Sequence, residues 1–295
     1  MKVSLAVEQK TNPDGFVKPG ELVDMRSGAD LSLQDRRVFN LLIENAWSEI
    51  AEAKTHSIPI SRLRGPHHKG GERVAESVST LMTTLVEIPA QLNGEAAVYK
   101  TQLLGPTTQV IDEASPRAML LYSFPEGLRE IIKDSRYWGR IKAWVMFSFT
   151  SKYALALYEA VCLRANLRVD EQMFGINEFR ALLGVEKDQY PGIPQLKQKV
   201  LTPAVSEVNA LSDFNVRVQI VREGGLQRGT VTGFLLWWER KSSEEWRAVM
   251  DELDRPRVGR IARIQGKAAQ QDDMVSAVTA HGLRPVARGK VGTAA

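Results

Sequence analysis

The sequence has one cysteine, Cys162, in 295 residues, which excludes a framework of internal disulfides. Such scarcity is typical of proteins from a reducing compartment, so we expect a cytoplasmic location. Because Cys162 lies between Val161 and Leu163 in a predicted helix, we expect a buried thiol rather than a nucleophile. Long apolar runs are also missing: no stretch reaches the ~18 residues of a membrane span, so we expect no membrane partner. The N-terminus, Met1 to Glu8, is charged too early to be a signal peptide.

Residue patterns for nucleotide and metal chemistry are scarce as well. The sequence has no Gly-rich loop ending in Gly-Lys-Ser or Gly-Lys-Thr, which excludes nucleotide hydrolysis by a P-loop. One Cys and 4 His do not supply a zinc site. His67 and His68 are adjacent, whereas enzymes that nick DNA hold their metal with a His-apolar-His triplet, so we interpret them as part of a basic turn. We therefore expect no cofactor, no metal and no catalysis.

The net charge of +4 is unevenly distributed along the chain. Counting Lys and Arg against Asp and Glu, residues 1–136 have 16 against 18, a balance of −2. Residues 137–240 have 13 against 10 and residues 241–295 have 10 against 7, which is +3 for each segment. The basic excess in the second half favours a polyanionic partner there.

The stretch from Pro194 to Leu211 predicts a helix with an unusual polar face. An apolar stripe recurs at helical spacing and indicates the buried side; it comprises Leu196, Val200, Ala204, Val208 and Leu211. The opposite side has no carboxylate and comprises Gln195, Gln198, Lys199, Thr202, Ser206 and Asn209, with Lys197 on the flank. Amides, hydroxyls and cations are groups that contact base edges and phosphates without repelling a polyanion. Glu207 falls toward the apolar side and needs a partner that the sequence does not identify.

A hairpin is predicted directly after this helix. Apolar and polar residues alternate from Phe214 to Ile220, a Gly-rich loop spans Arg222–Gly229, and a second strand runs from Thr230 to Trp238. A polar-faced helix followed by a hairpin with Arg222 and Arg228 in its loop is typical of a winged helix. The helix would enter the major groove, and the loop would lie along the DNA backbone. An amphipathic helix packed on a hairpin in another α+β protein is the alternative.

The first half of the chain has the same order of elements. Residues 1–30 are expected to be a flexible, strand-poor lead-in. A capping box at Ser32 opens a helix to about Ile50, Ile58–Leu63 is a candidate short second helix, and a third helix spans about Glu72–Glu87. Strands follow at Ala96–Leu104 and Arg117–Phe124. We therefore predict an α+β fold of two tandem winged helices, at 31–135 and 136–240. Within 241–295 we expect a short helix that a capping box opens at Ser242, and a basic, mostly disordered tail from Pro256 onward.

Several motifs together resemble the iteron-binding, theta-type plasmid replication initiators. The likeness covers about residues 30–240, and the quoted motifs are Leu121–Arg129, Ser151–Glu159, Phe179–Val185, Tyr190 and Leu196–Asn209. The resemblance implies that the second winged helix binds iterons in a plasmid origin and an operator in double-stranded DNA. It implies that the first is mainly a dimer interface with supporting DNA contacts. It also implies a bacterial cytoplasm, a monomer–dimer equilibrium, repression of its own promoter by the dimer, and recruitment of host initiator and helicase proteins.

By position, Lys197 and Lys199 match basic residues early in the family's recognition helix. Gln195 and Gln198 stand where the family pattern leads us to expect arginine. Ser151, Lys152 and Tyr153 match a helix start that approaches a phosphate. The residues expected to contact DNA are Ser151, Lys152, Tyr153, Gln195, Lys197, Gln198, Lys199, Thr202, Ser206, Arg222 and Arg228. Those expected to make auxiliary contacts are Arg62, Arg64, Lys69 and Arg73. A double winged-helix transcriptional repressor and a nicking (rolling-circle) initiator are the alternative functions.

Overall fold

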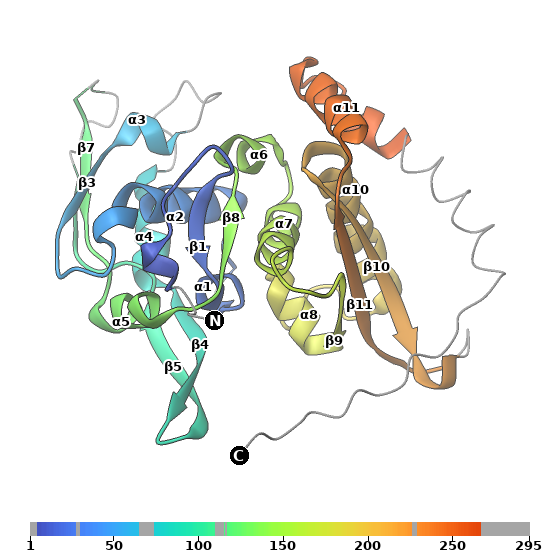
Figure 1. The fold of residues 1–295 in the computed structure, drawn as a ribbon, viewed down its shortest axis with the longest axis horizontal. Coiled ribbons are helices and arrows are strands. Elements are labelled where there is room, and N and C mark those ends of the chain that lie inside the picture. Colours follow the sequence, from blue (N-terminus) through green and yellow to red (C-terminus); the bar gives the residue numbers. More distant parts are fainter. Residues whose placement is uncertain are drawn as a thin grey trace. The chain divides into compact units, whose positions relative to one another are not determined.

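The structure, a computed structural model, describes residues 5–27, 30–64, 74–109, 115, 117–225 and 229–266. The chain divides into two units, Met1–Arg255 and Pro256–Ala295, and all elements named below belong to the first. Its described strands form one two-stranded sheet, β1-β8, and three three-stranded sheets, β2-β4-β5, β3-β7-β6 and β10-β11-β9. The mixture of short sheets and helices confirms the expected α+β class (Figure 1).

The elements up to residue 141 include the long helix α2. They are η1 (Ala6–Glu8), β1 (Phe16–Pro19), α1 (Gly20–Val23), β2 (Arg26–Ser27), α2 (Leu33–Ala46), η2 (Trp47–Glu49), β3 (His56–Pro59), α3 (Ile60–Leu63), α4 (Val74–Thr83), β4 (Leu85–Leu92), β5 (Glu95–Gln102), β6 (Thr107–Gln109), β7 (Met119–Tyr122), α5 (Glu126–Asp134) and β8 (Trp138–Ile141). The predicted capping box opens α2: Ser32 Oγ accepts from Asp35 N at 3.1 Å, and Ser32 N donates to Asp35 Oδ2 at 2.8 Å.

The elements after residue 142 include the long helix α7. They are α6 (Ala143–Ser148), α7 (Lys152–Arg164), β9 (Glu171–Gly175), α8 (Ile176–Leu183), α9 (Ile193–Leu196), η3 (Lys197–Leu201), α10 (Thr202–Leu211), β10 (Phe214–Arg222), η4 (Glu223–Gly225), β11 (Val231–Arg240) and α11 (Ser243–Asp254). Gly184 ends α8 in a left-handed conformation (φ 69°), the C-cap that its position predicts.

The expectation of a flexible, strand-poor lead-in is wrong for residues 5–27. β1 pairs antiparallel with β8, with Phe16 opposite Ile141, although more than a hundred residues separate the two strands in sequence. Phe16 and Val17 are fully buried because β1 also contacts α2. The lead-in is therefore part of the core, and burial of its apolar side chains compensates for its lack of periodicity.

The first hairpin differs from the predicted one. The expected helix Glu72–Glu87 ends at Thr83, and β4 then pairs with β5 along its whole length, from Leu85 opposite Gln102 to Leu92 opposite Glu95. Asn93 and Gly94 form the two-residue connection, with φ values of 54° and 84°. Positive φ at both positions is the type I′ requirement that Asn-Gly satisfies. The predicted partner strand, β7, pairs with β3 and β6 instead.

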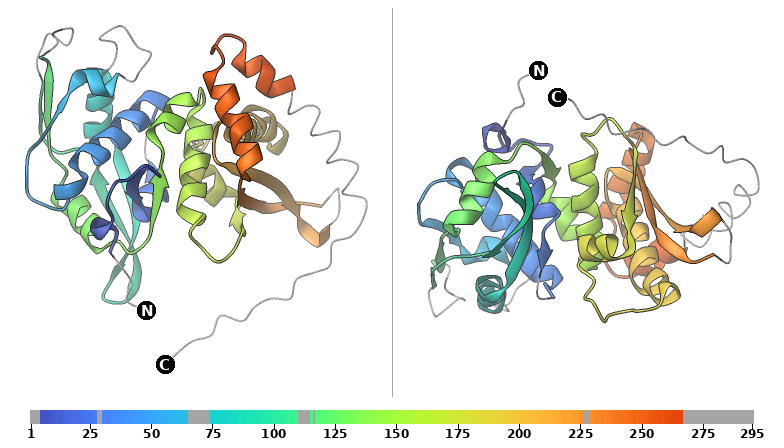
Figure 2. Two further views of the ribbon diagram at one scale, coloured as in Figure 1. Left: turned by 45° about the horizontal axis from the view of Figure 1, so that its top comes forward. Right: turned by 90° about the horizontal axis from the view of Figure 1, so that it is seen from below.

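α7 is the central helix of the longer unit. Every residue from Ala154 to Arg164 is buried, which requires neighbours on all sides. The helix contacts β8 and α2 from the first half and α8 and α10 from the second (Figures 1 and 2). Cys162 is 4% exposed, as expected for a structural thiol, and burial raises its pKa well above the ordinary value. α7 thus joins the first half of the chain to α10.

The C-terminal part is more ordered at its start than predicted. α11 begins at the expected capping box, where Ser242 N donates to Glu245 Oε2 at 2.8 Å. In the shorter unit residues 260–266 are helical, so the expectation of disorder from Pro256 onward is wrong for this segment. Residues 267–295, with the rest of the predicted basic tail, lie outside the described residues.

Candidate nucleic-acid interface

The polar-faced helix runs from Ile193 to Leu211 as α9, η3 and α10, and we call it the recognition helix. η3 is a π-helical turn in which Thr202 N donates to Lys197 O, five residues back. Pro203 is the second residue after η3, and it has no N–H to donate to the carbonyl oxygen of Lys199, four residues earlier. A proline within a helix is a usual cause of such a local widening, and η3 carries Lys197, Gln198 and Lys199 outward.

The buried stripe of this helix is confirmed. Each of the five predicted residues is at most 1% exposed. On the other side the exposed residues are Gln195, Lys197, Gln198, Lys199 and Thr202. Neither Lys197 nor Lys199 forms an ion pair within the described part of the chain. The exposed face therefore presents two uncompensated cations beside amide and hydroxyl groups.

Further along the helix, the polar side chains bond within the protein. Ser206 is half-buried, and its Oγ donates to Thr202 O at 2.8 Å. Asn209 accepts from Val216 N at 2.7 Å and donates to Val216 O at 3.0 Å, so its amide pairs with β10 like a neighbouring strand. The prediction that Asn209 shares the DNA-facing side is corrected by these bonds. The exposed polar face is the N-terminal half of the helix.

Glu207, which fitted the apolar stripe badly, has its partners at the start of α7. Its Oε2 accepts from Thr150 N at 2.7 Å and Ser151 N at 3.4 Å, and its Oε1 accepts from Thr150 Oγ1 at 2.7 Å. A carboxylate at a helix N-terminus satisfies unbonded backbone N–H groups and is favoured by the helix dipole. Glu207 thereby fixes the recognition helix against α7.

The three residues predicted at that helix start have partners inside the protein. Ser151 is the N-cap of α7, and its Oγ accepts from Tyr153 N at 3.2 Å. Lys152 forms an ion pair with Asp30. Tyr153 donates its hydroxyl to Gln189 Oε1 at 3.1 Å, and burial raises its pKa to about 12. All three are half-buried. Their approach to a phosphate stays a prediction, and carboxylates now stand beside two of them.

The long turn before the recognition helix is held by Arg180. This buried guanidinium donates to the carbonyl oxygens of Tyr190 and Glu186, each at 2.9 Å, and also to that of Gln189. Five N–H donors in one plane suit an arginine to this bridging task. The turn is longer than that of a tight helix-turn-helix, and Arg180 replaces the missing regular hydrogen bonds.

β10 and β11 form the predicted hairpin, and β9, which was not predicted, pairs with the other edge of β11. At the loop, Glu223 N donates to Thr230 O at 2.8 Å, and Arg222 Nη1 donates to Gly229 O at 2.8 Å. Arg222 therefore closes the base of the loop. Arg228 lies outside the described residues.

Two family models match successive parts of the chain. The initiator replication protein WH1 model matches residues 16–162, and the initiator Rep protein WH2 model matches residues 175–236. The chain belongs to the initiator replication protein family. It is a plasmid replication initiator with two tandem winged-helix domains, as predicted. A search of the curated proteins found no match.

The first match extends over α7 as far as Cys162, and we assigned this helix to the second winged helix. Our boundary at 135/136 stays a prediction.

Of the residues expected to make auxiliary DNA contacts, Arg62 is half-exposed on α3 and donates to Asn45 Oδ1 at 3.2 Å, and Arg64 is half-buried. Lys69 and Arg73 lie outside the described residues, as do His67 and His68. Within the described residues, no group of three or more His, Cys, Asp or Glu side chains is placed to hold a metal ion, and no helix is long and apolar enough to cross a membrane.

Proposed function

We propose that this initiator binds iterons in a plasmid origin through the N-terminal half of the recognition helix and the β10–β11 hairpin. The observation that carries the proposal is the exposed face of Gln195, Lys197, Gln198, Lys199 and Thr202, where no described carboxylate pairs with either lysine. Cations there bind phosphates, and the amides can each bond a base edge with a donor and an acceptor. The opposite side is buried against the core, which leaves this face to meet DNA.

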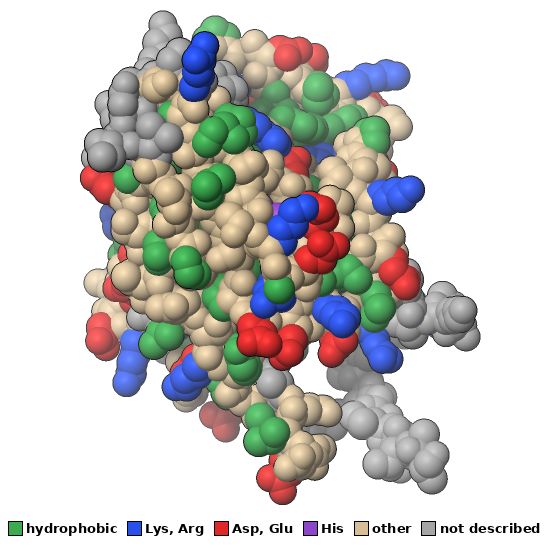
Figure 3. All heavy atoms as spheres, turned by 90° about the vertical axis from the view of Figure 1, so that its left-hand side faces the viewer, with side chains coloured by type: hydrophobic (Ala, Val, Ile, Leu, Met, Phe, Trp, Pro, Cys, Tyr) green, Lys and Arg blue, Asp and Glu red, His purple; other side chains and the backbone are tan. Residues whose placement is uncertain are grey.

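The proposal includes a dimer that represses the initiator's own promoter. Its support is the hairpin β4–β5, whose exposed apolar side chains include Leu85 (57%), Leu92 (68%), Val98 (58%) and Tyr99 (37%). The hairpin projects at the bottom of the view in Figures 1 and 3. Exposed apolar side chains gathered on one projecting element mark a protein–protein interface. The proposal also includes opening of the origin and recruitment of host initiator and helicase proteins. Membership of the family is the support for these two functions.

Footprinting the purified initiator on the DNA upstream of its own reading frame tests the iteron assignment. We expect protection of short repeats at a regular spacing, because one recognition helix reads one repeat. The matched variants are Lys199→Ala, on the exposed face, and Lys133→Ala, exposed on α5. The first should lose the footprint at protein concentrations where the second keeps it. Uniform protection without repeats, or equal loss in both variants, would contradict the proposal.

A further inference from the structure

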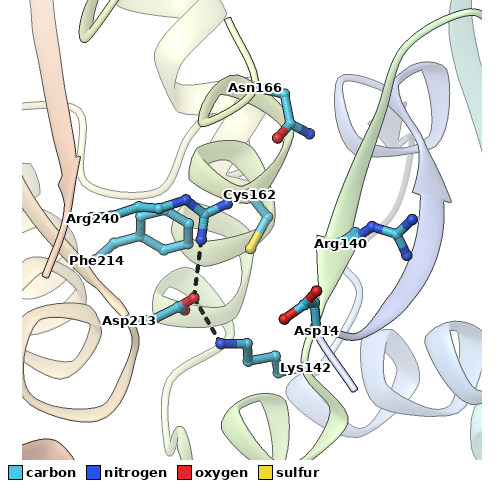
Figure 4. A pocket seen from close by; sticks show the side chains of 8 residues that line it. All are labelled: Asp14, Arg140, Lys142, Cys162, Asn166, Asp213, Phe214 and Arg240. Atoms are coloured by element: carbon cyan, nitrogen blue, oxygen red, sulfur yellow. Dashed lines mark hydrogen bonds and ion pairs between the residues drawn. The ribbon is translucent and has the colours of Figure 1, made fainter. Parts of the chain in front are cut away.

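A polar cavity of about 310 Å³ lies at the end of the β10–β11 hairpin that is distant from the wing loop. Arg140 and Lys142 line it from β8 and the residue after, Cys162 from α7, and Asp213 and Arg240 from the start of β10 and the end of β11. Figure 4 shows the Cys162 sulfur pointing into a space with Arg240 and Asp213 on one side and Arg140 on the other. The cavity therefore joins elements from both halves of the longer unit.

The charges around this cavity are incompletely matched. Lys142 Nζ and Arg240 Nη1 both bond Asp213 Oδ2, at 2.9 Å and 3.4 Å. The second oxygen, Asp213 Oδ1, is buried and has no hydrogen-bond partner within the described part of the chain. A buried acceptor without a hydrogen bond destabilises the folded protein unless a ligand or solvent group donates to it.

Arg140 supplies a further cation. It donates Nη1 to Lys10 O at 2.9 Å and forms no ion pair among the described residues. A guanidinium has five N–H donors, so most of those on Arg140 remain for another acceptor. With Asp14 at the rim, the lining carries three cations against two carboxylates. Guanidinium groups match phosphate oxygens in geometry as well as in charge.

We propose that the cavity binds a small phosphomonoester that also carries a hydrogen-bond donor, of the nucleoside monophosphate class. Arg240 binds the phosphate, Arg140 adds positive charge at the opposite wall, and Asp213 Oδ1 accepts from a hydroxyl or amine of the same molecule. The volume lies at the lower end of the ~300–1,000 Å³ found for ligand sites, which admits one small molecule and excludes a nucleic-acid strand. Cys162 forms an apolar wall, since burial raises its pKa and keeps the thiol neutral.

An occupant of this cavity contacts both halves of the longer unit without covering the DNA-facing residues. Asp213 follows the C-terminus of α10, whereas Lys197 and Lys199 lie in η3, in the N-terminal half of the recognition helix. Arg240 and Phe214 face each other at the open end of the hairpin, and the loop at residues 223–229 joins the other ends of the same strands. Binding therefore stabilises the folded protein and leaves iteron recognition accessible.

Thermal unfolding and titration calorimetry of the full-length protein test the proposal with three probes. AMP carries both groups, inorganic phosphate lacks the donor-bearing part, and adenosine lacks the anion. We expect AMP to bind one to one and to raise the Tm with concentration, phosphate to bind more weakly, and adenosine to have no effect. Adenosine or phosphate binding as tightly as AMP, or no binding by AMP, would overturn the proposal.

Two variants and a control locate the site. Arg140→Ala and Arg240→Ala should each weaken AMP binding by about tenfold, since each removes a positive charge from the lining of the cavity. Arg247→Ala removes an exposed arginine on α11 and should bind as the wild type does. Circular dichroism without ligand shows whether each variant is folded. Unchanged AMP affinity in both folded cavity variants, or displacement of AMP by origin DNA, would contradict the assignment.

Discussion

Lys18 on β1 forms an ion pair with Glu159 on α7 at 2.9 Å, and both side chains are 3% exposed. Asn40 on α2 bonds both partners: its Oδ1 accepts from Lys18 Nζ at 2.9 Å, and its Nδ2 donates to Glu159 Oε1 at 2.5 Å. Burial lowers the pKa of Lys18, and the Glu159 carboxylate opposes that shift. One buried polar cluster thus ties the lead-in and the first long helix to the central helix.

Replacing Lys18 by Met should destabilise the protein by about 3–5 kcal/mol, because Glu159 would stay buried without its cation. The double variant Lys18→Met/Glu159→Met should recover part of this loss, since no charge then stays buried. Lys54→Met is the control: it breaks an ion pair with Glu49 in which each side chain is 44% exposed. That change should cost less than about 1 kcal/mol. Denaturant unfolding measures the free energy of unfolding of all three variants. A double variant no more stable than Lys18→Met would show that the loss of stability does not come from the unpaired charge on Glu159.

Local sequence patterns predicted what depends on near neighbours. The apolar stripe from Leu196 to Leu211 and the capping boxes at Ser32 and Ser242 are set by residues within one or two helical turns. β4 was missed because Leu85–Leu92 contains Pro89 and Ala90, which weaken its strand pattern. The Asn93-Gly94 pair was a signal that should have located this hairpin.

The remaining errors involve partners distant in sequence. β1 has no alternation of its own and becomes a strand through pairing with β8. β9 is likewise short and pairs with β11 about sixty residues later. The partner of Glu207 lies 57 residues away and that of Lys152 lies 122 residues away. Hence the exposed face of the recognition helix could be predicted, whereas the carboxylates beside Ser151 and Lys152 could not.

Replacing Glu207 by Ala should lower the free energy of unfolding by about 1–3 kcal/mol, because the N–H and O–H groups of Thr150 lose their buried acceptor. DNA affinity should fall as the recognition helix loses its contact with α7, while the slope of affinity against salt should persist. The salt slope reports phosphate contacts, and Glu207 makes none. Ser206→Ala, at the neighbouring position, is the control, with an expected change within about 0.5 kcal/mol. A variant as stable as wild type would contradict the capping role.

Lys241 gives the stability a specific dependence on pH. Its Nζ donates to Ser212 O at 2.7 Å and also to Asn209 O, at the end of α10. Burial lowers its pKa from 10.5 to about 8. Between these two values the unfolded chain keeps this proton and the folded protein has lost it, so stability rises with pH across this window. Below pH 8 both states are protonated and the contribution is constant.

The check on Lys241 is a comparison with Lys241→Met, which cannot titrate. The free energy of unfolding of the wild type minus that of the variant should increase between pH 8 and pH 10.5. Taking the difference removes the contributions of other groups that titrate in both proteins. A difference that stays flat across the window would show that Lys241 keeps its ordinary pKa, and a difference that falls would show that its pKa is raised; either result would contradict the account.

Val98→Asp should shift the initiator from dimer to monomer, because a charge would be buried in the proposed interface. Val98 is 58% exposed within the described chain, so the fold itself should survive. Leu167→Asp is a matched control, at an apolar residue that is 52% exposed before β9. Sedimentation gives the oligomeric state and circular dichroism the fold. A folded Val98→Asp variant that still dimerises would remove β4–β5 from the interface.

The most direct measurement is the salt dependence of binding to the initiator's own upstream DNA for wild type, Lys199→Ala and Lys133→Ala. Each phosphate contact contributes a slope of about −0.9 to a plot of log affinity against log salt concentration. Lys199→Ala should bind more weakly and show a slope shallower by about 0.9, while Lys133→Ala should match the wild type. If the Lys199→Ala variant kept both the affinity and the slope of the wild type, the exposed face of the recognition helix would not be the surface that meets DNA.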